Sequence, residues 1–252
     1  MFVKICGITN EEDALLAVAL GADCLGFNFV PGSPRKISAH DAEAIVRRLP
    51  HGTVTVGVFK NESPETIVST ITQCGLSGAQ LHGREPVSEV RWIRKRLPFV
   101  IQAFSADDPH LSSAGNSPAD ILLLDAATPG AGHVFDWRLA SNAPAGVRLM
   151  IAGGLNPDNV ADAVTQLKPY GVDVATGVEA SPGKKDAKKM QKFIALAKST
   201  AGEGENQKSE KKDEHETERS FSSQRTSGNV RSSTSGVRTP RGTIYDWADD
   251  GQ

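Results

Sequence analysis

The sequence predicts an α/β protein: a single (β/α)8 barrel over residues 1–200, followed by a disordered tail over residues 201–252. Short apolar runs of strand length alternate with helix-like segments eight times in about 200 residues. Strands that alternate with helices form a parallel sheet, because each crossover returns the chain to the same end. Eight units can close into a barrel, a fold whose usual length starts near ~200 residues.

The first four units are the most regular. Their strands are predicted at residues 3–6, 24–29, 54–59 and 78–81, and their helices at about 10–20, 38–49, from 63 onward, and 86–96. Each of the first three helices follows a side chain that can cap it: Thr9 or Asn10, then Ser38, then Ser63. Pro64 would occupy the first helical position, where its missing N–H costs nothing.

The last four units are less even. Their strands are predicted at residues 99–103, 120–124, 148–152 and 172–175. The fifth helix is weak or missing in the Ser-, Pro- and Gly-rich stretch 105–118, and a short helix is expected at about 135–140. The final two helices are predicted at 157–167, with Asn156 as N-cap, and at about 186–198.

An open doubly wound sheet is the competing fold. Such sheets usually have fewer strands and a glycine-rich phosphate loop after the first strand. Here the glycine-rich turns follow the late strands, which favours the barrel.

Composition excludes several classes of partner. The formal net charge of −2 indicates no nucleic-acid partner, and no run approaches the ~20 apolar residues of a membrane span. Residues 1–5 are too short for a secretory signal, and Cys6, Cys24 and Cys74 have no disulfide-like or metal-like spacing. Reduced thiols in the cytoplasm, with no bound metal, are the expectation.

The tail differs from the body in composition. It is rich in Ser, Gly, Glu, Lys, Arg and Thr and has few large apolar residues, so burial cannot offset the entropy of ordering it. We therefore expect disorder over 201–252. Residues 243–250 could still act as a short linear motif that folds on a partner.

Function in such a barrel is expected where strands end and loops to the helices begin. Cys6 ends the first strand, where a lowered pKa would make it a thiolate base; the alternative is a small inert core residue. Lys4 should lie lower on the same face. Asp125 ends the sixth strand, where partial desolvation would keep it protonated as a general acid; the alternative is a loop cap.

Glycine-rich turns follow the seventh and eighth strands. Gly153-Gly154 and Thr176-Gly177 can point backbone N–H groups at an anion, and these strand ends often hold phosphate in barrels. Tight turns that need a positive φ are the alternative.

Two further side chains are candidates for substrate binding. Arg35, in the second loop, could clamp a carboxylate with its guanidinium, or could be an ordinary solvated charge. His82, after the fourth strand, could orient substrate or cap its loop.

Several motifs occur in a fixed order along the body. They are Lys4-Ile5-Cys6-Gly7-Ile8-Thr9, Gly26-Phe27-Asn28-Phe29 with Ser33-Pro34-Arg35, Val56-Gly57-Val58-Phe59, Gln80-Leu81-His82-Gly83, Leu123-Leu124-Asp125 with Phe135-Asp136-Trp137, Ala152-Gly153-Gly154-Leu155, and Gly171-Val172-Asp173 with Gly177-Val178-Glu179 and Pro182-Gly183. In these motifs the chain resembles the phosphoribosylanthranilate isomerases of tryptophan biosynthesis, over about residues 2–198.

The resemblance implies a cofactor-free Amadori rearrangement of a phosphosugar, an N-(5-phosphoribosyl)anthranilate. It implies Asp125 as the acid that opens the sugar ring and Cys6 as the base that removes the proton from C2′. It implies Arg35 on the anthranilate carboxylate, and backbone donors around Gly153, Gly154, Thr176 and Gly177 on the phosphate.

Two loops depart from the family pattern. Residues 129–133 lack the usual hydroxyl, so no side-chain phosphate contact is assigned there, and Ala175-Thr176-Gly177 keeps only one of two hydroxyls.

Two other functions compete with this reading. Another phosphosugar barrel enzyme would need a Lys acid or a metal site. The sequence has no Lys at a strand end facing the mouth of the barrel, and its histidines lack the spacing of metal ligands. The second alternative is an inactive barrel that binds phosphoribosyl ligands, or a scaffold whose tail is the functional part. Neither would need both Cys6 and Asp125.

Overall fold

A computed structural model describes residues 1–106, 108–109, 111–125 and 143–202. The tail predicted over 201–252 therefore lies almost wholly outside the described residues, as do the short helix expected at 135–140 and the loop 129–133. The division into domains near residue 200 stays a prediction.

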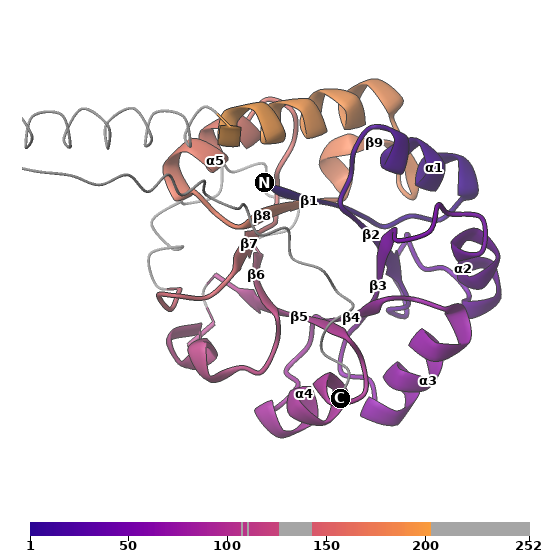
Figure 1. Cartoon of the computed structure of the whole chain (residues 1–252), viewed down its shortest axis with the longest axis vertical. Coiled ribbons are helices and arrows are strands. Elements are labelled where there is room, and N and C mark those ends of the chain that lie inside the picture. Colours follow the sequence, from indigo (N-terminus) through magenta and orange to yellow (C-terminus); the bar gives the residue numbers. More distant parts are fainter. Residues whose placement is uncertain (107, 110, 126–142, 203–252) are drawn as a thin grey trace, which may run out of the picture. The chain divides into compact units, whose positions relative to one another are not determined.

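Eight parallel strands form a closed barrel in chain order, from β1 to β8 and back to β1 (Figure 1). The strands are β1 Phe2–Cys6, β2 Cys24–Asn28, β3 Val54–Phe59, β4 Gly78–Leu81, β5 Phe99–Ser105, β6 Ile121–Asp125, β7 Leu149–Ile151 and β8 Gly171–Val174. The ring closes where Phe2 to Ile5 of β1 pair with Gly171 to Val174 of β8. The predicted (β/α)8 barrel is confirmed.

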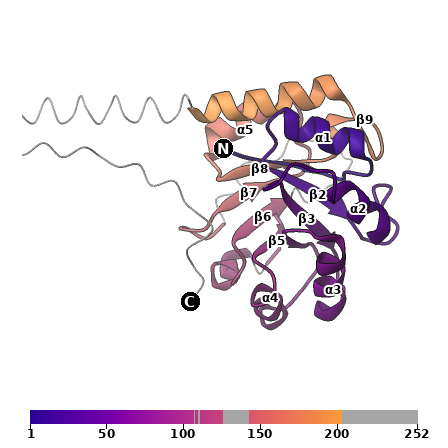
Figure 2. The ribbon, with the colours of Figure 1, turned by 45° about the vertical axis from the view of Figure 1, so that its right-hand side comes forward.

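The helices surround the strands (Figures 1 and 2). They are α1 Glu11–Ala19, α2 Ala39–Val46, α3 Pro64–Cys74, α4 Val87–Arg94 and α5 Val160–Leu167, with a final helix over 187–202. Asn10, Ser38 and Ser63 cap the first three, each accepting a backbone N–H from the third residue along. Asn10, and not Thr9, is thus the first cap.

The expected weakness of the fifth helix is confirmed, and the chain departs from the predicted elements in two other places. In place of a fifth α-helix there is only a 3₁₀ helix, Leu111–Asn116, in agreement with the weak signal there. The helix predicted from residue 157 with Asn156 as cap was placed too early: α5 begins at Val160 and its N-cap is Asn159, whose Oδ1 accepts the Asn156 N–H at 2.8 Å. A hairpin of β9 Glu179–Ser181 and β10 Lys184–Lys185 was not predicted.

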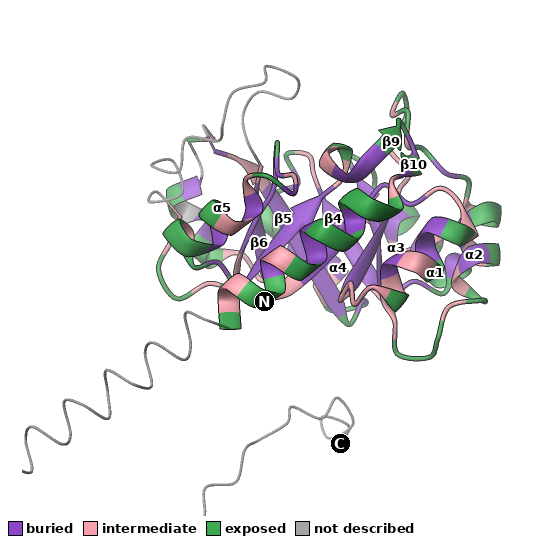
Figure 3. Ribbon diagram, turned by 90° about the horizontal axis from the view of Figure 1, so that it is seen from above, coloured by how far each residue is buried: buried purple, intermediate pink, exposed green. Residues whose placement is uncertain are grey.

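Apolar side chains pack in two layers. The larger fills the space between the strands and the helices, so the helices present buried residues inward and exposed residues outward (Figure 3). The smaller fills the barrel itself, and includes Cys24, Val56, Ile101, Leu123 and Met150. Since side chains alternate along a strand, every second residue of each strand faces this interior.

Within the described residues, no helix has both the length and the apolar character that crossing a membrane requires.

Candidate active site

Cys6 and Asp125 face the barrel interior at the same end. Leu123 belongs to the interior layer, and Asp125 lies two residues further along β6. Lys4 pairs in register with interior Cys24, and Cys6 lies two residues beyond Lys4 on β1. Both side chains therefore stand where parallel strands end and the loops to the helices begin.

The Cys6 thiol is almost completely buried, with only 8% of the residue exposed. Burial raises its pKa above the ordinary value, and the ammonium groups of Lys4 and Lys185 oppose this only in part. The lowered pKa expected from the sequence is therefore wrong. The expectation failed because the burial of the thiol raises its pKa by more than the two ammonium groups lower it.

A buried ion pair lies beneath Cys6. Lys4 Nζ donates to Asp173 Oδ1 at 2.9 Å, and the Lys4 side chain has no exposed surface. Burial alone would lower the pKa of Lys4, but the Asp173 carboxylate raises it above its ordinary value. A Cβ built on Gly26 would lie 2.9 Å from Cys6 Sγ and 3.0 Å from Lys4 Nζ, so both groups pack against this glycine.

Asp125 has a different environment. Its Oδ2 lies 3.2 Å from Nε2 of His82, and the two side chains are 28% and 36% exposed. On its other side the His82 ring meets Gln80, with Nδ1 3.1 Å from the amide nitrogen. Gln80 is buried, and its Oε1 has no hydrogen-bond partner among the described residues. The structure thus brings His82 to the carboxyl of Asp125, a contact that its sequence position did not indicate.

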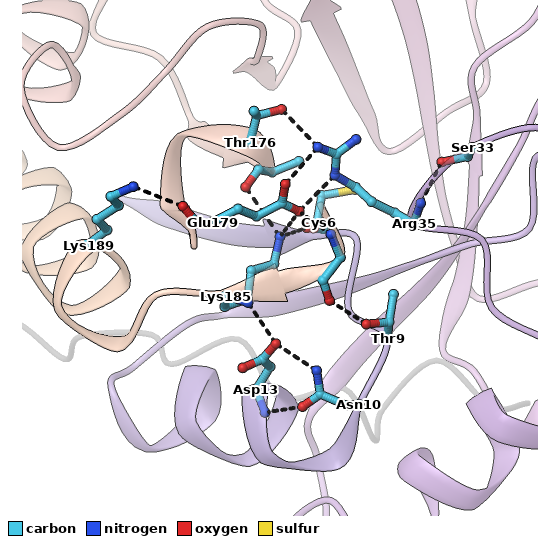
Figure 4. Close-up of polar contacts among 12 residues, drawn as sticks. Cys6, Thr9, Asn10, Asp13, Ser33, Arg35, Thr176, Glu179, Lys185 and Lys189 are labelled. Carbon is cyan, nitrogen blue, oxygen red and sulfur yellow. Dashed lines mark hydrogen bonds and ion pairs between the residues drawn. The ribbon is translucent and has the colours of Figure 1, made fainter. Parts of the chain in front are cut away.

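Arg35 is held rigidly and is not an ordinary solvated charge. Its Nε and Nη2 donate to the two oxygens of Glu179, each at 2.7 Å, and Nη2 also donates to Thr176 Oγ1 at 3.2 Å (Figure 4). The hydrogen bonds to Glu179 raise the pKa of Arg35. The Arg35 side chain passes so close to Gly7 that a Cβ there would lie 2.5 Å from its Cδ, and Gly7 has a φ of +74°.

The two late glycine segments come together. A Cβ on Gly177 would lie 1.9 Å from the carbonyl oxygen of Leu155, so the loop after β8 packs directly against the loop after β7. Gly153 and Gly154 have φ values of +82° and +69°. A cavity of about 370 Å³ borders Gly177, and its lining consists of Asn156, Pro157, Asp158, Gly177, Lys188, Lys189 and Lys192.

Two charged residues next to Cys6 were missed by sequence reasoning. Glu179 accepts from Arg35, and also from Lys185 Nζ at 3.1 Å. Lys185 Nζ donates to the Cys6 carbonyl at 2.5 Å. Local sequence offers no signal for Lys185, because its neighbour Lys184 is exposed and the run reads as a solvated surface. Glu179 could have been suspected, since it stands in one of the ordered motifs.

Residues 3–196 match the family model for N-(5′-phosphoribosyl)anthranilate (PRA) isomerase. The chain belongs to this family. A PRA isomerase from Pelobacter propionicus is 46% identical over 206 residues, which cover 80% of this chain and 97% of the relative. The crystal structure of the Thermus thermophilus enzyme has a TM-score of 0.73 at 42% identity, covering 79% of this chain and 99% of that one.

A second solved PRA isomerase is in complex with reduced 1-(o-carboxyphenylamino)-1-deoxyribulose 5-phosphate. It has a TM-score of 0.70 at 42% identity, covering 79% of this chain and 99% of that chain. The family resemblance seen in the ordered motifs is thereby confirmed.

Proposed function

We propose that Cys6 and Asp125 carry out the Amadori rearrangement of N-(5-phosphoribosyl)anthranilate to 1-(2-carboxyphenylamino)-1-deoxyribulose 5-phosphate. By its family the chain is an isomerase of tryptophan biosynthesis. The observation that carries the two roles is geometric: a thiol and a carboxyl close two separate strands, β1 and β6, and both face one interior. An aldose-to-ketose shift needs an acid and a base at different substrate atoms, and this spacing provides them.

The two side chains then supply two proton transfers, which a tautomerisation follows, and the proposed reaction uses no cofactor. Asp125 gives its proton to the furanose ring oxygen, the C1′–O bond breaks, and the anthranilate nitrogen forms a Schiff base with C1′. The Cys6 thiolate takes the proton from C2′, which leaves an enolamine that tautomerises to the ketone. The contact of Asp125 Oδ2 with His82 Nε2 would orient the carboxyl for the first step.

The anthranilate carboxylate would bind Arg35. Glu179 and Thr176 occupy Nε and Nη2, and among contacts with the described residues Nη1 takes no part. The Nη1 edge is therefore the edge from which an incoming carboxylate can accept hydrogen bonds. Because Glu179 fixes the other edge, the guanidinium pays little ordering entropy when the substrate binds.

The phosphate would bind where the loops after β7 and β8 meet. Gly153 and Gly154 have the positive φ values of a glycine turn that can point backbone N–H groups at an anion, and Gly177 packs against the carbonyl of Leu155 in the same region. The adjacent cavity supports a negatively charged ligand at this edge: Lys192 pairs with its one acidic residue, Asp158, at 2.7 Å, and Lys188 and Lys189 add two further positive charges.

The setting of the reaction completes the proposal. The substrate partner is a small phosphosugar, the location is the cytoplasm, and neither a nucleic acid nor a membrane is a proposed partner. We assign catalysis to residues 1–200, so deletion of 201–252 should leave turnover intact; a large loss would show that the tail takes part in the reaction.

Substitution of the two proposed catalytic residues tests the function. Cys6→Ala and Asp125→Ala should each lower kcat at least ~100-fold, the lower end of the usual contribution of general acid–base catalysis. Turnover is followed by the loss of the fluorescence of the N-substituted anthranilate substrate, and circular dichroism checks the fold. Cys74→Ala is a matched control, because that thiol lies away from the interior and contacts the Ala39 carbonyl. Near-normal turnover by Cys6→Ala would overturn the base assignment.

Complementation gives an independent test. The wild-type chain should restore growth without tryptophan to an auxotroph that lacks this isomerase, whereas the Cys6→Ala and Asp125→Ala variants should not. Growth supported by either variant would contradict the proposed roles.

A further inference from the structure

Lys185, on β10, has a completely buried ammonium beside the proposed base. Its side chain has no exposed surface, and its Nζ donates to the Cys6 carbonyl at 2.5 Å, the Ala175 carbonyl at 3.3 Å and Glu179 Oε1 at 3.1 Å (Figure 4). Three acceptors match the three N–H donors of an ammonium. The backbone of Lys185 is fixed as well, because its N–H donates to Asp13 Oδ2 at 2.8 Å.

The two carbonyls belong to neighbouring strands at the point where their pairing stops. The pairing of β1 with β8 ends at Ile5 and Val174, so Cys6 and Ala175 are the residues that follow the two paired segments. Beyond this point Lys185 bonds both carbonyls and so joins the strand ends in place of a ladder hydrogen bond. The backbone that carries the thiol is thereby tied to a residue 179 positions away.

We propose that Lys185 is a positioning residue for Cys6: its ammonium holds the end of β1 so that the thiol faces the substrate. The inference rests on the proposed role of Cys6 as the base. Glu179 supports it by binding Lys185 and Arg35 through the same carboxylate, so the base and the carboxylate clamp share one anchor.

Charge gives Lys185 a second effect on Cys6. The charged and titratable groups that face the thiol are Lys4 and Asp173 below it, Cys24 on β2, Arg35 in the second loop and Lys185. Burial and Asp173 raise the pKa of Cys6, whereas Lys4 and Lys185 lower it. A neutral side chain at position 185 would therefore leave less thiolate at any given pH.

The ammonium can stay charged at this buried position because of its acceptors. Burial lowers the pKa of Lys185, and the Glu179 carboxylate opposes that shift. Glu179 itself is kept ionised: burial would raise its pKa, but Arg35 and Lys185 bring it below the ordinary value.

The test compares Lys185→Met with Lys184→Met, a matched control in the same two-residue strand whose side chain is exposed. Lys185→Met should lower kcat at least about tenfold with KM within about twofold, since misplacement of a catalytic group by an ångström can cost on the order of 100-fold. The rate at which iodoacetamide alkylates Cys6 at pH 8.5, followed by peptide mass mapping without substrate, should fall at least about threefold. Lys184→Met should change neither quantity.

Two outcomes would overturn the inference: a Cys6 alkylation profile of Lys185→Met that matches the wild type, or an unchanged kcat. If Lys185→Met fails to fold, the double variant Lys185→Met with Glu179→Gln removes the unpaired carboxylate, and the same fall in alkylation is expected. Alkylation is measured without turnover, so it tests Lys185 even if Cys6→Ala shows that Cys6 is not the base.

Discussion

Cys6 and Asp125 close two strands of one barrel, yet their surroundings differ in burial and in charge. Around Cys6 the side chains of Lys4, Asp173 and Lys185 are almost fully buried, and each charge is matched by an opposite one. Around Asp125 the one charged or titratable partner described is His82, and both side chains are about one-third exposed.

The difference fits the two proposed jobs. A base that takes a proton from carbon works best in a dry site where its position is fixed, and charges held in low dielectric interact strongly there. An acid that serves the ring oxygen must regain a proton after each turnover, which contact with solvent allows. The residues that surround the base should therefore respond to single substitutions much more strongly than the residue that contacts the acid.

The largest expected effect is on stability at the base side. Lys4→Met leaves the Asp173 carboxylate buried without its partner, which should lower the free energy of unfolding by about 3–5 kcal/mol. Denaturant titration followed by circular dichroism measures it. Lys4→Met combined with Asp173→Leu should recover most of the loss, because an apolar pair replaces the ion pair; a cost below about 1 kcal/mol for the single variant would contradict the picture of a tightly buried pair.

The second prediction concerns steric crowding of the Cys6 thiol, with no change of charge. Gly26→Ala places a methyl group 2.9 Å from Cys6 Sγ and 3.0 Å from Lys4 Nζ, so the thiol must move. We expect kcat to fall roughly 10- to 100-fold, as measured by the fluorescence assay. Gly202→Ala is the control, since a Cβ at Gly202 meets nothing within 4 Å. Full activity of Gly26→Ala would show that the thiol position is not critical.

The third prediction concerns pH. Burial raises the pKa of the Cys6 thiol, and the base is active only when deprotonated, so the active fraction is small at pH 7. The thiolate fraction should rise about tenfold per pH unit until the pKa is reached, so the rate at which iodoacetamide alkylates Cys6 in the absence of substrate should still be increasing above pH 9. A pH–rate profile from 7 to 10 measures this. A plateau below pH 8 would mean that the thiolate forms more easily than its burial implies.

The smallest effect is expected on the acid side. His82→Asn removes the contact with Asp125, but both groups are partly exposed, so the free energy of unfolding should change by less than about 1 kcal/mol. Turnover should fall only a few-fold, because solvent can replace the lost polar contact. Unfolding and turnover measurements on His82→Asn and Lys4→Met test the difference between the surroundings of Cys6 and Asp125 directly. A larger loss of stability for His82→Asn than for Lys4→Met would contradict it.

Features that depend on neighbours in sequence were predicted well. The caps at Ser38 and Ser63 are local hydrogen bonds within three residues, so residue type and position suffice to find them. The alternation of strand-like and helix-like segments is also a local pattern, so it was enough to predict the barrel. The start of α5 was placed too early because Asn156 does accept the Asp158 N–H at 2.8 Å, as a cap would, but residues 157–159 form a turn and the helix begins only at Val160.

The sequence by itself determined the order of the strands and which reactive side chains end them, because strand pattern and turn residues are local properties. Only the tertiary structure decided the chemistry around those ends. Lys185 reaches Cys6 through a hairpin 179 residues further along the chain, and Glu179 reaches Arg35 from a similar distance. The direction of the Cys6 pKa depends on how much water and how many charges the folded chain leaves near the sulfur, and residues remote in sequence supply both.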